Sequence, residues 1–401
     1  MRLPRGAWTA TLLACSCASC DSVPQQALTA CESVGIASAK TDILFVVDDS
    51  GSMAQRQSNL ATNFQTFADR LSSLPIKNDF QIGVTTTSVH QQAGTAYVTT
   101  FPPSSASCNP VPNAGQPYPQ GALVSVTGPD DPTQRYQSTS DPPRILVAGS
   151  PTLVQDFRND VYVGVCGSGK EQGLEAARLA VSEPLASGAN AGFLRPGARL
   201  AVIVVSDDDD CSDPLMQGTS NEPTGCTSYD VQNYVDFFKG QIGGSSRNVV
   251  VGAITGVDPS TLQPSVCIGP GGPPEHAAVR YKAFIDAFGP LGLIDSICEP
   301  SFAPTLERIA TLIGQEVPLS LVPADWHLLT VTLTRSAGQV VSCGVAPSDP
   351  AACRLGYTGD AGADVVYAPP SGPDRKPTLT FQGRFTIAPG DTIEVKVLCA
   401  G

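Results

Sequence analysis

The stretch Asp42-Ile-Leu-Phe-Val-Val-Asp48-Asp49-Ser50-Gly51-Ser52-Met53 decides the fold. Its apolar run predicts a buried strand over residues 43–47, and this strand leads directly into two aspartates and two serines. In open α/β sheets, ligands bind just outside the carboxyl ends of the strands. The oxygen-bearing side chains at this strand end suit Mg²⁺, Mn²⁺ or Ca²⁺. A helix is predicted next, because apolar residues recur with helical spacing at Met53, Leu60, Phe64, Phe67, Leu71 and Leu74.

Further strands alternate with helices along the chain. Strands are predicted over residues 80–87, 199–206 and 248–255. Helices are predicted over 152–160, 174–185, 229–239, 277–288 and 302–313. This alternation predicts an α/β fold with a doubly wound, mostly parallel sheet. Residues from about 90 to 150 interrupt the pattern with Pro, Gly, Ser and Asn, so we expect a long insertion there, strand-like only over 121–127.

The pattern of apolar residues changes after Pro318. Short strand-like runs at 327–335, 365–367, 379–381, 385–387 and 393–397 are separated by Gly, Pro and Asp, and no helical spacing occurs among them. A chain of 401 residues is also long for a single core. The sequence therefore predicts an α/β domain over 36–320 and a smaller all-β, β-sandwich-like domain over 321–401.

The N-terminus has the features of an export signal. Residues 1–5 are basic, and residues 6–14 form an apolar run too short to span a bilayer. Leu12-Leu13-Ala14-Cys15 resembles a bacterial lipobox, so Cys15 is the candidate lipidated residue, with Cys17 and Cys20 close by. We expect a signal peptide over 1–15 and a tether over 16–35. The protein would be a lipoprotein of the bacterial outer membrane or cell envelope, bound to the membrane only through its N-terminal lipid.

The 13 cysteines favour an oxidising compartment. They form no paired CxxC motifs with a nearby His, so a zinc site is not indicated. Cys211 and Cys226 flank one loop and Cys343 and Cys353 another, which makes both pairs candidate disulfides. Cys108 is expected to anchor the insertion and has Cys166 as one candidate partner, although spacing alone does not fix the pairing.

The net charge of −13 argues against nucleic acid as a partner. Phosphate backbones are bound by clustered Lys and Arg, and the chain contains no basic stripe.

The run DILFVVDDSGSM resembles the opening strand and metal motif of von Willebrand factor type A domains, whose Asp-x-Ser-x-Ser signature is met here by Asp48, Ser50 and Ser52. In that family a hydroxyl on a Gly-rich loop and an Asp at the end of a later strand complete a metal-ion-dependent adhesion site. The resemblance assigns these places to Ser168, where Thr is usual, and to Asp207, which is followed by an Asp in place of the usual Gly. It implies binding of Mg²⁺ (or Mn²⁺ or Ca²⁺) and, through the ion, of an Asp or Glu carboxylate on a partner protein.

Three more carboxylates lie close to these positions in sequence. Asp49, Asp208 and Glu171 could each support the ion from nearby, although Glu171 could equally favour a helix N-terminus through its dipole. Asp209 and Asp210 are expected in a solvated acidic loop. The segment 164–170 fits the GxxxxGK phosphate loop, but Glu171 stands where that loop needs Ser or Thr.

Catalysis has little support in the sequence. The histidines His90, His276 and His327 lie in unrelated contexts, where surface or second-domain packing is expected, and no GxSxG or HExxH motif occurs. The prediction is a metal-dependent binding protein and not an enzyme. Two alternatives stay open: a metal-dependent envelope hydrolase whose base is Asp208, Glu171 or a His of the insertion, and a structural lipoprotein with a vestigial site.

Overall fold

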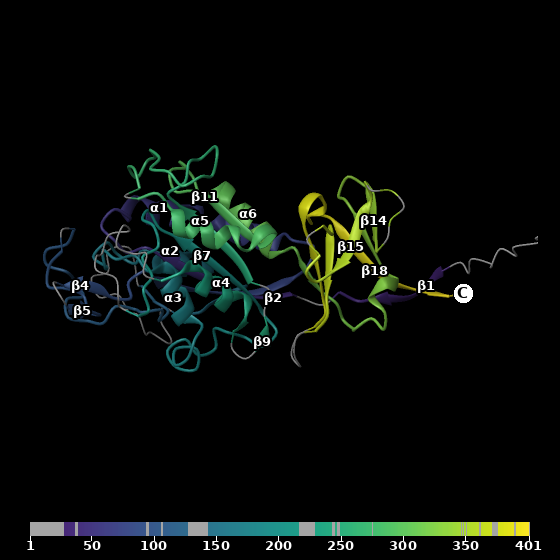
Figure 1. Cartoon of the computed structure of the whole chain (residues 1–401), viewed down its shortest axis with the longest axis horizontal. Helices are drawn as coiled ribbons and strands as arrows, with labels where there is room; N and C mark the ends of the chain where they lie inside the picture. The colour runs from purple at the N-terminus through teal and green to yellow at the C-terminus, as the bar shows by residue number, and fades with distance from the viewer. Residues whose placement is uncertain are drawn as a thin grey trace, which may run out of the picture.

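The computed structural model describes residues 28–400 except 37–38, 94–95, 106, 127–142, 216–228, 243–244, 247–248, 275, 346, 348, 350, 361, 371–375 and 389. Figure 1 shows an α/β region at one end and a curled all-β sheet at the other. The candidate lipidation residue Cys15 and the predicted signal peptide lie outside the described residues.

The predicted first strand forms β2 (Ala39–Val47), in the middle of a six-stranded sheet with the order β11-β10-β7-β2-β3-β6. Its parallel neighbours are β3 (Asn78–Thr86) and β7 (Arg199–Val205). Beyond β7 lie β10 (Val249–Thr255) and β11 (Gly292–Ser296), and β6 (Leu146–Val147) pairs antiparallel with β3. The chain adds β3 on one side of β2 and later β7 on the other. Strand order therefore reverses between β2 and β7, which is where ligands bind in this architecture.

Helices cover both faces of this sheet, so the predicted doubly wound arrangement is confirmed. One face carries α1 (Ala54–Ser72), α2 (Leu153–Asp160) and α6 (Ala303–Ile313). The other carries α3 (Gly173–Ala180), α4 (Val231–Lys239) and α5 (Val279–Asp286). The helix predicted to continue to residue 185 ends at Ala180. This region also contains two short strands that pair with each other, β8 (Gln241–Ile242) and β9 (Ser245–Ser246), and a 3₁₀ turn, η2 (Gly289–Leu291).

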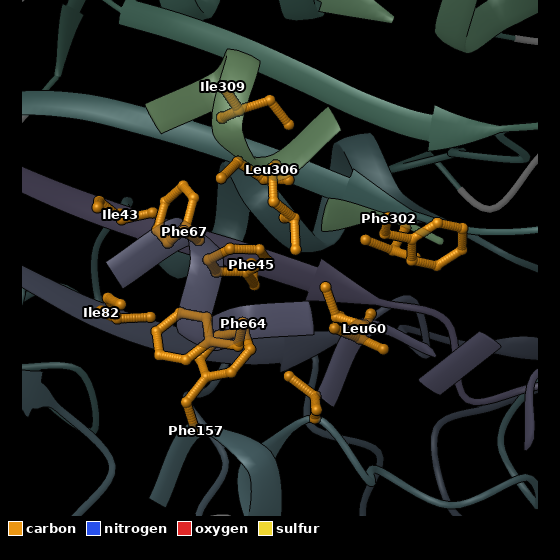
Figure 2. Close-up of a cluster of buried hydrophobic side chains, with 14 of the residues drawn as sticks. Ile43, Phe45, Leu60, Phe64, Phe67, Ile82, Phe157, Phe302, Leu306 and Ile309 are labelled. Carbon is orange, nitrogen blue, oxygen red and sulfur yellow. The ribbon is translucent and has the colours of Figure 1, made fainter. Parts of the chain in front are cut away.

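Alternate residues of β2 enter opposite cores, as expected for a strand buried on both faces. Phe45 points into the core under α1 and α2, where Phe64 stacks on Phe157 with 3.6 Å between ring centroids (Figure 2). Leu44 points into the core on the other face. The apolar face predicted for α1 is buried, including Met53, Leu60, Phe67, Leu71 and Leu74.

The described part of the insertion folds back onto the α/β region. It contains the paired strands β4 (Gln91–Ala93) and β5 (Ala96–Val98). Residues 121–126 do not form a strand, although the Val124 N–H donates to the carbonyl of Val84 in β3 at 2.8 Å. Thr127 lies outside the described residues.

The all-β region is one curled sheet of eight strands, in the order β1-β18-β13-β14-β15-β16-β17-β12, and not two stacked sheets. The predicted all-β part is confirmed as a separate sheet, whose strands share a hydrophobic core of their own. A 3₁₀ turn, η3 (Trp326–Leu328), precedes β13. The strands are β1 (Leu28–Val34), β12 (Glu316–Pro318), β13 (Leu329–Thr334), β14 (Val340–Gly344), β15 (Cys353–Tyr357), β16 (Val365–Ala368), β17 (Thr378–Phe381) and β18 (Thr392–Ala400).

Three expectations about this sheet need correction. Residues 28–34, expected in the tether, form β1 and pair antiparallel with β18. Strand β12 belongs to the all-β sheet although it precedes the predicted boundary at residue 320. Residues 385–387 are not a strand, because η4 (Gly383–Phe385) occupies their start. Strands at sheet edges are held by backbone hydrogen bonds, so their side chains show little of the alternation that identifies a strand in a sequence.

Disulfides fasten both regions. The predicted Cys343–Cys353 bond is confirmed, and Cys108 bonds to Cys166 as considered above. A further bond, Cys267–Cys298, was not predicted. Cys211 is disulfide-bonded, whereas its predicted partner Cys226 lies outside the described residues. Of the helices that the structure describes, none combines the length and apolar character that a bilayer span requires.

Candidate metal site

Parallel pairing places the ends of β2 and β7 side by side. Val47 is opposite Val205, and the Asp48 N–H donates to the Val205 carbonyl at 2.9 Å. Asp48 is then fixed by two further bonds: Oδ2 accepts from the Ser206 hydroxyl at 2.7 Å and Oδ1 accepts from the Ser50 N–H at 2.8 Å. The carboxylate that ends the first strand is therefore held at the point where strand order reverses.

The two serines of the motif lie between the two strand-end aspartates. The hydroxyl oxygens of Ser50 and Ser52 are 3.4 Å apart, and Ser52 donates to Asp207 Oδ1 at 2.9 Å. Four of the five predicted ligands, Asp48, Ser50, Ser52 and Asp207, thus come together from loops that are distant in sequence.

Ser168 takes a different position. Its hydroxyl donates to the His90 carbonyl at 3.0 Å, and its N–H donates to the Ser88 hydroxyl at 2.7 Å. Ser88 in turn donates to Asp49 Oδ1 at 2.7 Å. Within the described chain, the contacts of Ser168 connect it to Asp49 and not to Asp48.

Glu171 and Asp208 lie beside the four gathered groups. Their side chains hydrogen-bond each other, and the charge of Glu171 acts on that of Asp48. Glu171 is positioned by its backbone, since its carbonyl accepts from Cys211 N–H at 2.6 Å. Asp208 also contacts His276, whose Nδ1 is 2.7 Å from Asp208 Oδ1.

The carboxyls of this site are costly to ionise. Burial raises the pKa of Asp48 well above its usual value, and the charge of Asp207 raises it further. Burial likewise raises the pKa of Glu171, with Asp48 and Asp208 adding repulsion. For Asp207 and Asp208 burial again raises the pKa, while Arg56 and His276 respectively lower it. Buried like charges gathered in this way favour binding of a cation.

Asp49 faces the loop before α3. Its Oδ1 accepts from Ser88, while its buried Oδ2 has no hydrogen-bond partner among the described residues. Its backbone carbonyl accepts from Gly167 N–H at 2.7 Å, and only glycine fits at 167 because a Cβ there would collide with the Asp49 carboxyl. Burial raises the pKa of Asp49 to about 7.

Arg56 was not anticipated from the sequence. Its Nη1 lies 2.8 Å from Asp207 Oδ2 and donates to the Ser52 carbonyl at 2.7 Å. Its Nη2 donates to the carbonyls of Gly272 and Pro273 at 3.1 and 3.2 Å. The side chain is 2% exposed, so a buried guanidinium balances one carboxylate of the site. Its position four residues after Ser52, one turn into the predicted helix, was the available signal.

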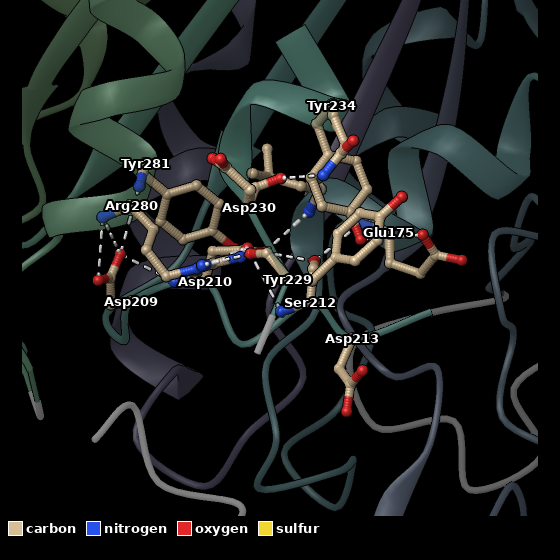
Figure 3. A network of polar contacts seen from close by, with 12 residues as sticks. Glu175, Asp209, Asp210, Ser212, Asp213, Tyr229, Asp230, Tyr234, Arg280 and Tyr281 are labelled. Atoms are coloured by element: carbon tan, nitrogen blue, oxygen red, sulfur yellow. Dashed lines mark hydrogen bonds and ion pairs between the residues drawn. The ribbon is translucent and has the colours of Figure 1, made fainter. Parts of the chain in front are cut away.

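Asp209 and Asp210 are buried, so the expectation of a solvated acidic loop is wrong (Figure 3). Asp209 accepts from the Arg280 N–H at 2.9 Å at the start of α5. Asp210 accepts from the Leu174 N–H at 3.1 Å at the start of α3 and pairs with the Arg280 guanidinium at 3.1 Å. These two carboxylates therefore cap two helices whose first N–H groups would otherwise be unsatisfied.

The donor set fits a hard divalent cation. It offers hydroxyl and carboxylate oxygens, which such ions prefer, and the hydroxyls coordinate without neutralising charge. Among the described residues no group of three or more His, Cys, Asp or Glu side chains has an arrangement that could hold a metal ion. A site of this kind would instead combine the Ser50 and Ser52 hydroxyls with the carboxylates of Asp48 and Asp207.

No protein-family model matches the sequence, and no curated protein matches it. Among solved structures, the chain is similar to a von Willebrand factor type A protein from Catenulispora acidiphila, at 12% identity and TM-score 0.33, over 91% of this chain and 59% of that one. It is also similar to proximal thread matrix protein 1 of the mussel byssus, at 15% identity and TM-score 0.34, over 71% and 50%. It is similar as well to the pilus adhesin SpaC of Lactobacillus rhamnosus GG, at 10% identity and TM-score 0.37, over 90% of this chain and 39% of that one. The chain thus spans at most 59% of the length of these proteins, and at such TM-scores function must be argued from the site itself.

Proposed function

We propose that the α/β region is a von Willebrand factor type A-like domain that binds a divalent cation and, through it, an acidic group of a partner protein. The observation that carries this proposal is the convergence of Asp48, Ser52 and Asp207 where strand order reverses, with Ser52 bonded to Asp207 at 2.9 Å. The proposed ion is Mg²⁺, with Mn²⁺ and Ca²⁺ as chemically similar candidates.

Each residue has a defined part in this proposal. Ser50 and Ser52 supply neutral oxygens, and Asp48 and Asp207 supply charge. Glu171 takes the place that the resemblance gave to Ser168, because its carboxyl reaches the site and the Ser168 hydroxyl is bound to the His90 carbonyl. The bound ion would supply a positive centre that an outside carboxylate can coordinate.

Isothermal titration calorimetry with Mg²⁺, Mn²⁺ and Ca²⁺ tests the site. Ser52→Ala removes a hydroxyl at the site and should weaken binding at least tenfold, equal to about 1.4 kcal/mol. Ser168→Ala is the matched control, because it removes a buried hydroxyl whose partners are the His90 carbonyl and the Lys170 N–H, and it should bind like the wild type. If the wild type binds none of the three ions, the site is vestigial and the proposal fails.

Pull-down from envelope extracts, with and without a chelator, tests the partner. Capture should require the ion and should be competed by a peptide rich in Asp and Glu. Capture that persists in chelator, or that the acidic peptide does not reduce, would contradict binding through a carboxylate.

We also propose export as a lipoprotein, on the basis of the lipobox-like sequence before Cys15 and the disulfides. Labelling cells with a fatty-acid analogue should modify the wild type and not Cys15→Ser. Retained labelling of the variant would indicate that another N-terminal cysteine carries the lipid.

A hydrolase is the second candidate, because a histidine lies beside one of the carboxylates of the proposed site. His276 Nδ1 is 2.7 Å from Asp208 Oδ1, and the ring is 32% exposed. A histidine oriented by a buried carboxylate can take a proton from water. Metal-dependent hydrolysis of ester or phosphodiester probes that His276→Gln abolishes would favour this candidate over adhesion.

A further inference from the structure

A cavity of about 180 Å³ lies between the α/β region and the all-β sheet. The start of β2, the segment before β7 and the end of α6 form its walls on one side, and β12 with the start of β17 forms them on the other. A single buried water needs only about 10–15 Å³ of such space, so the cavity has room for a small molecule. Ligands bind preferentially at junctions of this kind.

Hydrogen bonds between segments of the two regions hold the walls of the cavity in place. The Ser320 N–H donates to the Gly35 carbonyl at 2.7 Å, which ties the segment that follows β12 to the segment that leads into β2. The Leu319 N–H donates to the Pro377 carbonyl at 2.8 Å, beside Lys376. The backbone that carries the lining side chains is therefore fixed from both sides.

Arg199 is the buried cation of the cavity. Its side chain is 2% exposed, and its Nε lies 3.8 Å from Glu316 Oε2. Its Nη1 donates to the carbonyls of Leu312 and Ile313 at 3.4 and 2.9 Å, where α6 ends. A guanidinium group does not lose its proton in proteins. The wall of the cavity therefore carries a permanent positive charge with one carboxylate beside it.

Two lysines add to this charge. Lys40 and Lys376 both line the cavity and are exposed, so they lie where the cavity opens to solvent. Neither ammonium group has an ion-pair partner in the part of the chain that the structure describes. In contrast, Lys170, Lys282 and Lys396 each pair with a carboxylate. The two lysines of the cavity are thus available to an outside anion.

We propose that this cavity binds a small dianion, such as a phosphate monoester or a dicarboxylate. Its described lining carries three positive charges and one negative charge, a balance of about +2 in a protein whose net charge is −13. A dianion matches this balance, and ammonium groups bind phosphate and carboxylate oxygens through charge-assisted hydrogen bonds. The partly enclosed position strengthens these interactions relative to an open surface, because less water screens the charges.

The cavity is separate from the candidate metal site. Strand β2 begins where the α/β region meets the curled sheet (Figure 1), with Lys40 as its second residue, and Asp48 follows its last residue. Eight residues of extended strand span roughly 26 Å, so a dianion bound in the cavity does not touch the proposed ion. The inference thus goes beyond the proposed function and does not depend on it.

Isothermal titration calorimetry of the folded protein tests this inference. The titrants are glycerol phosphate, inorganic phosphate and succinate, in metal-free buffer at pH 8, where phosphate esters are dianions. At least one of them should bind with a Kd of about 1 mM or tighter. Acetate has a single charge and should bind at least about tenfold more weakly. Tighter binding of glycerol phosphate or of succinate would identify a phosphate monoester or a dicarboxylate as the class of ligand.

Substitutions of the two lysines locate the binding. Lys40→Gln and Lys376→Gln remove exposed charges and should each weaken binding of the dianion at least about fivefold. Lys396→Gln removes the same charge from β18, where its partner is Glu394, and should bind like the wild type. The inference is overturned if no dianion binds the wild type, if either cavity lysine is replaced without loss of affinity, or if Lys396→Gln loses as much affinity as they do.

Discussion

Asp49 offers a quantitative test of the electrostatics at the edge of the sheet where the parallel strands have their carboxyl ends. Its carboxyl is fully buried, and its pKa is raised from 3.8 to about 7, chiefly by burial. The folded state therefore holds a proton that the unfolded state releases, and stability must fall as pH rises between these values. Raising the pKa from 3.8 to about 7 corresponds to roughly 4 kcal/mol, which is the most that the stability can lose between pH 4 and pH 8.

Asp49→Asn removes this pH dependence, because an amide does not titrate. Its oxygen can still accept from Ser88, whereas its NH₂ replaces an oxygen without a hydrogen-bond partner and costs about 1–3 kcal/mol at every pH. We therefore expect the variant to be the less stable protein at pH 4 and the more stable one at pH 8. The difference in unfolding free energy should change by up to about 4 kcal/mol across this range.

Urea denaturation in chelator, followed by far-ultraviolet circular dichroism, measures this difference, because the described α-helices all lie in the α/β region. Asp258 is a control of opposite sign. It lies on a surface turn where hydrogen bonds from Thr261 and Ser260 lower its pKa, so Asp258→Asn should lose stability at pH 8 relative to pH 4. A pH-independent difference between Asp49→Asn and the wild type would refute the assigned burial of this carboxyl.

Three further substitutions test the site and the core. Arg56→Gln removes the cation beside Asp207 and should tighten divalent-ion binding about tenfold by calorimetry; unchanged affinity in a folded variant would show that Arg56 does not compete with the ion. Phe157→Ala removes a fully buried ring and should lower the free energy of unfolding by about 3–5 kcal/mol, so a loss below about 1 kcal/mol would contradict the packing. Asp210→Ala removes the buried carboxylate that pairs with the Arg280 guanidinium and should cost about 3–5 kcal/mol in the same urea assay, whereas exposed Asp236→Ala should change stability by less than about 0.5 kcal/mol.

The central elements were predictable because their patterns are long and consistent. Strand β2 is buried on both faces and is therefore apolar throughout its second half, and α1 repeats its apolar spacing over five turns of helix. The short strands β1, β11 and β14 were missed. Each depends on backbone pairing with a neighbour already in place, and side-chain alternation over five to seven residues does not report such pairing.

The acidic loop was misjudged although a signal existed. Neither α3 nor α5 has a capping side chain at its own N-cap, where Gln172 and Ala278 stand. Helices without a local cap need acceptors from elsewhere, and in a doubly wound sheet the helices that follow the strands begin at the strands' carboxyl edge. The run Asp209-Asp210 supplies those acceptors.

The proposed exchange of Ser168 for Glu171 could not be predicted, since motif spacing fixes a loop but not which side chain would face an ion. Gly167 packs against Asp49, and the hydroxyl of the next residue, Ser168, donates to the His90 carbonyl. The proposed exchange would change the charge of the site. A family-like set would hold two aspartates, whereas this edge gathers the carboxyls of Asp48, Asp207, Asp208 and Glu171.

The charges of the site bear on how it would bind a partner. Arg56 is the one permanent cation described in contact with these carboxyls, so four ionised groups would leave a net charge of about −3. A divalent ion reduces this to about −1, and a negative site would repel an outside carboxylate. The hydrogen bond between Glu171 and Asp208 requires one shared proton, and that proton removes the remaining negative charge. The extra carboxylates are therefore compatible with adhesion because they bind a proton together.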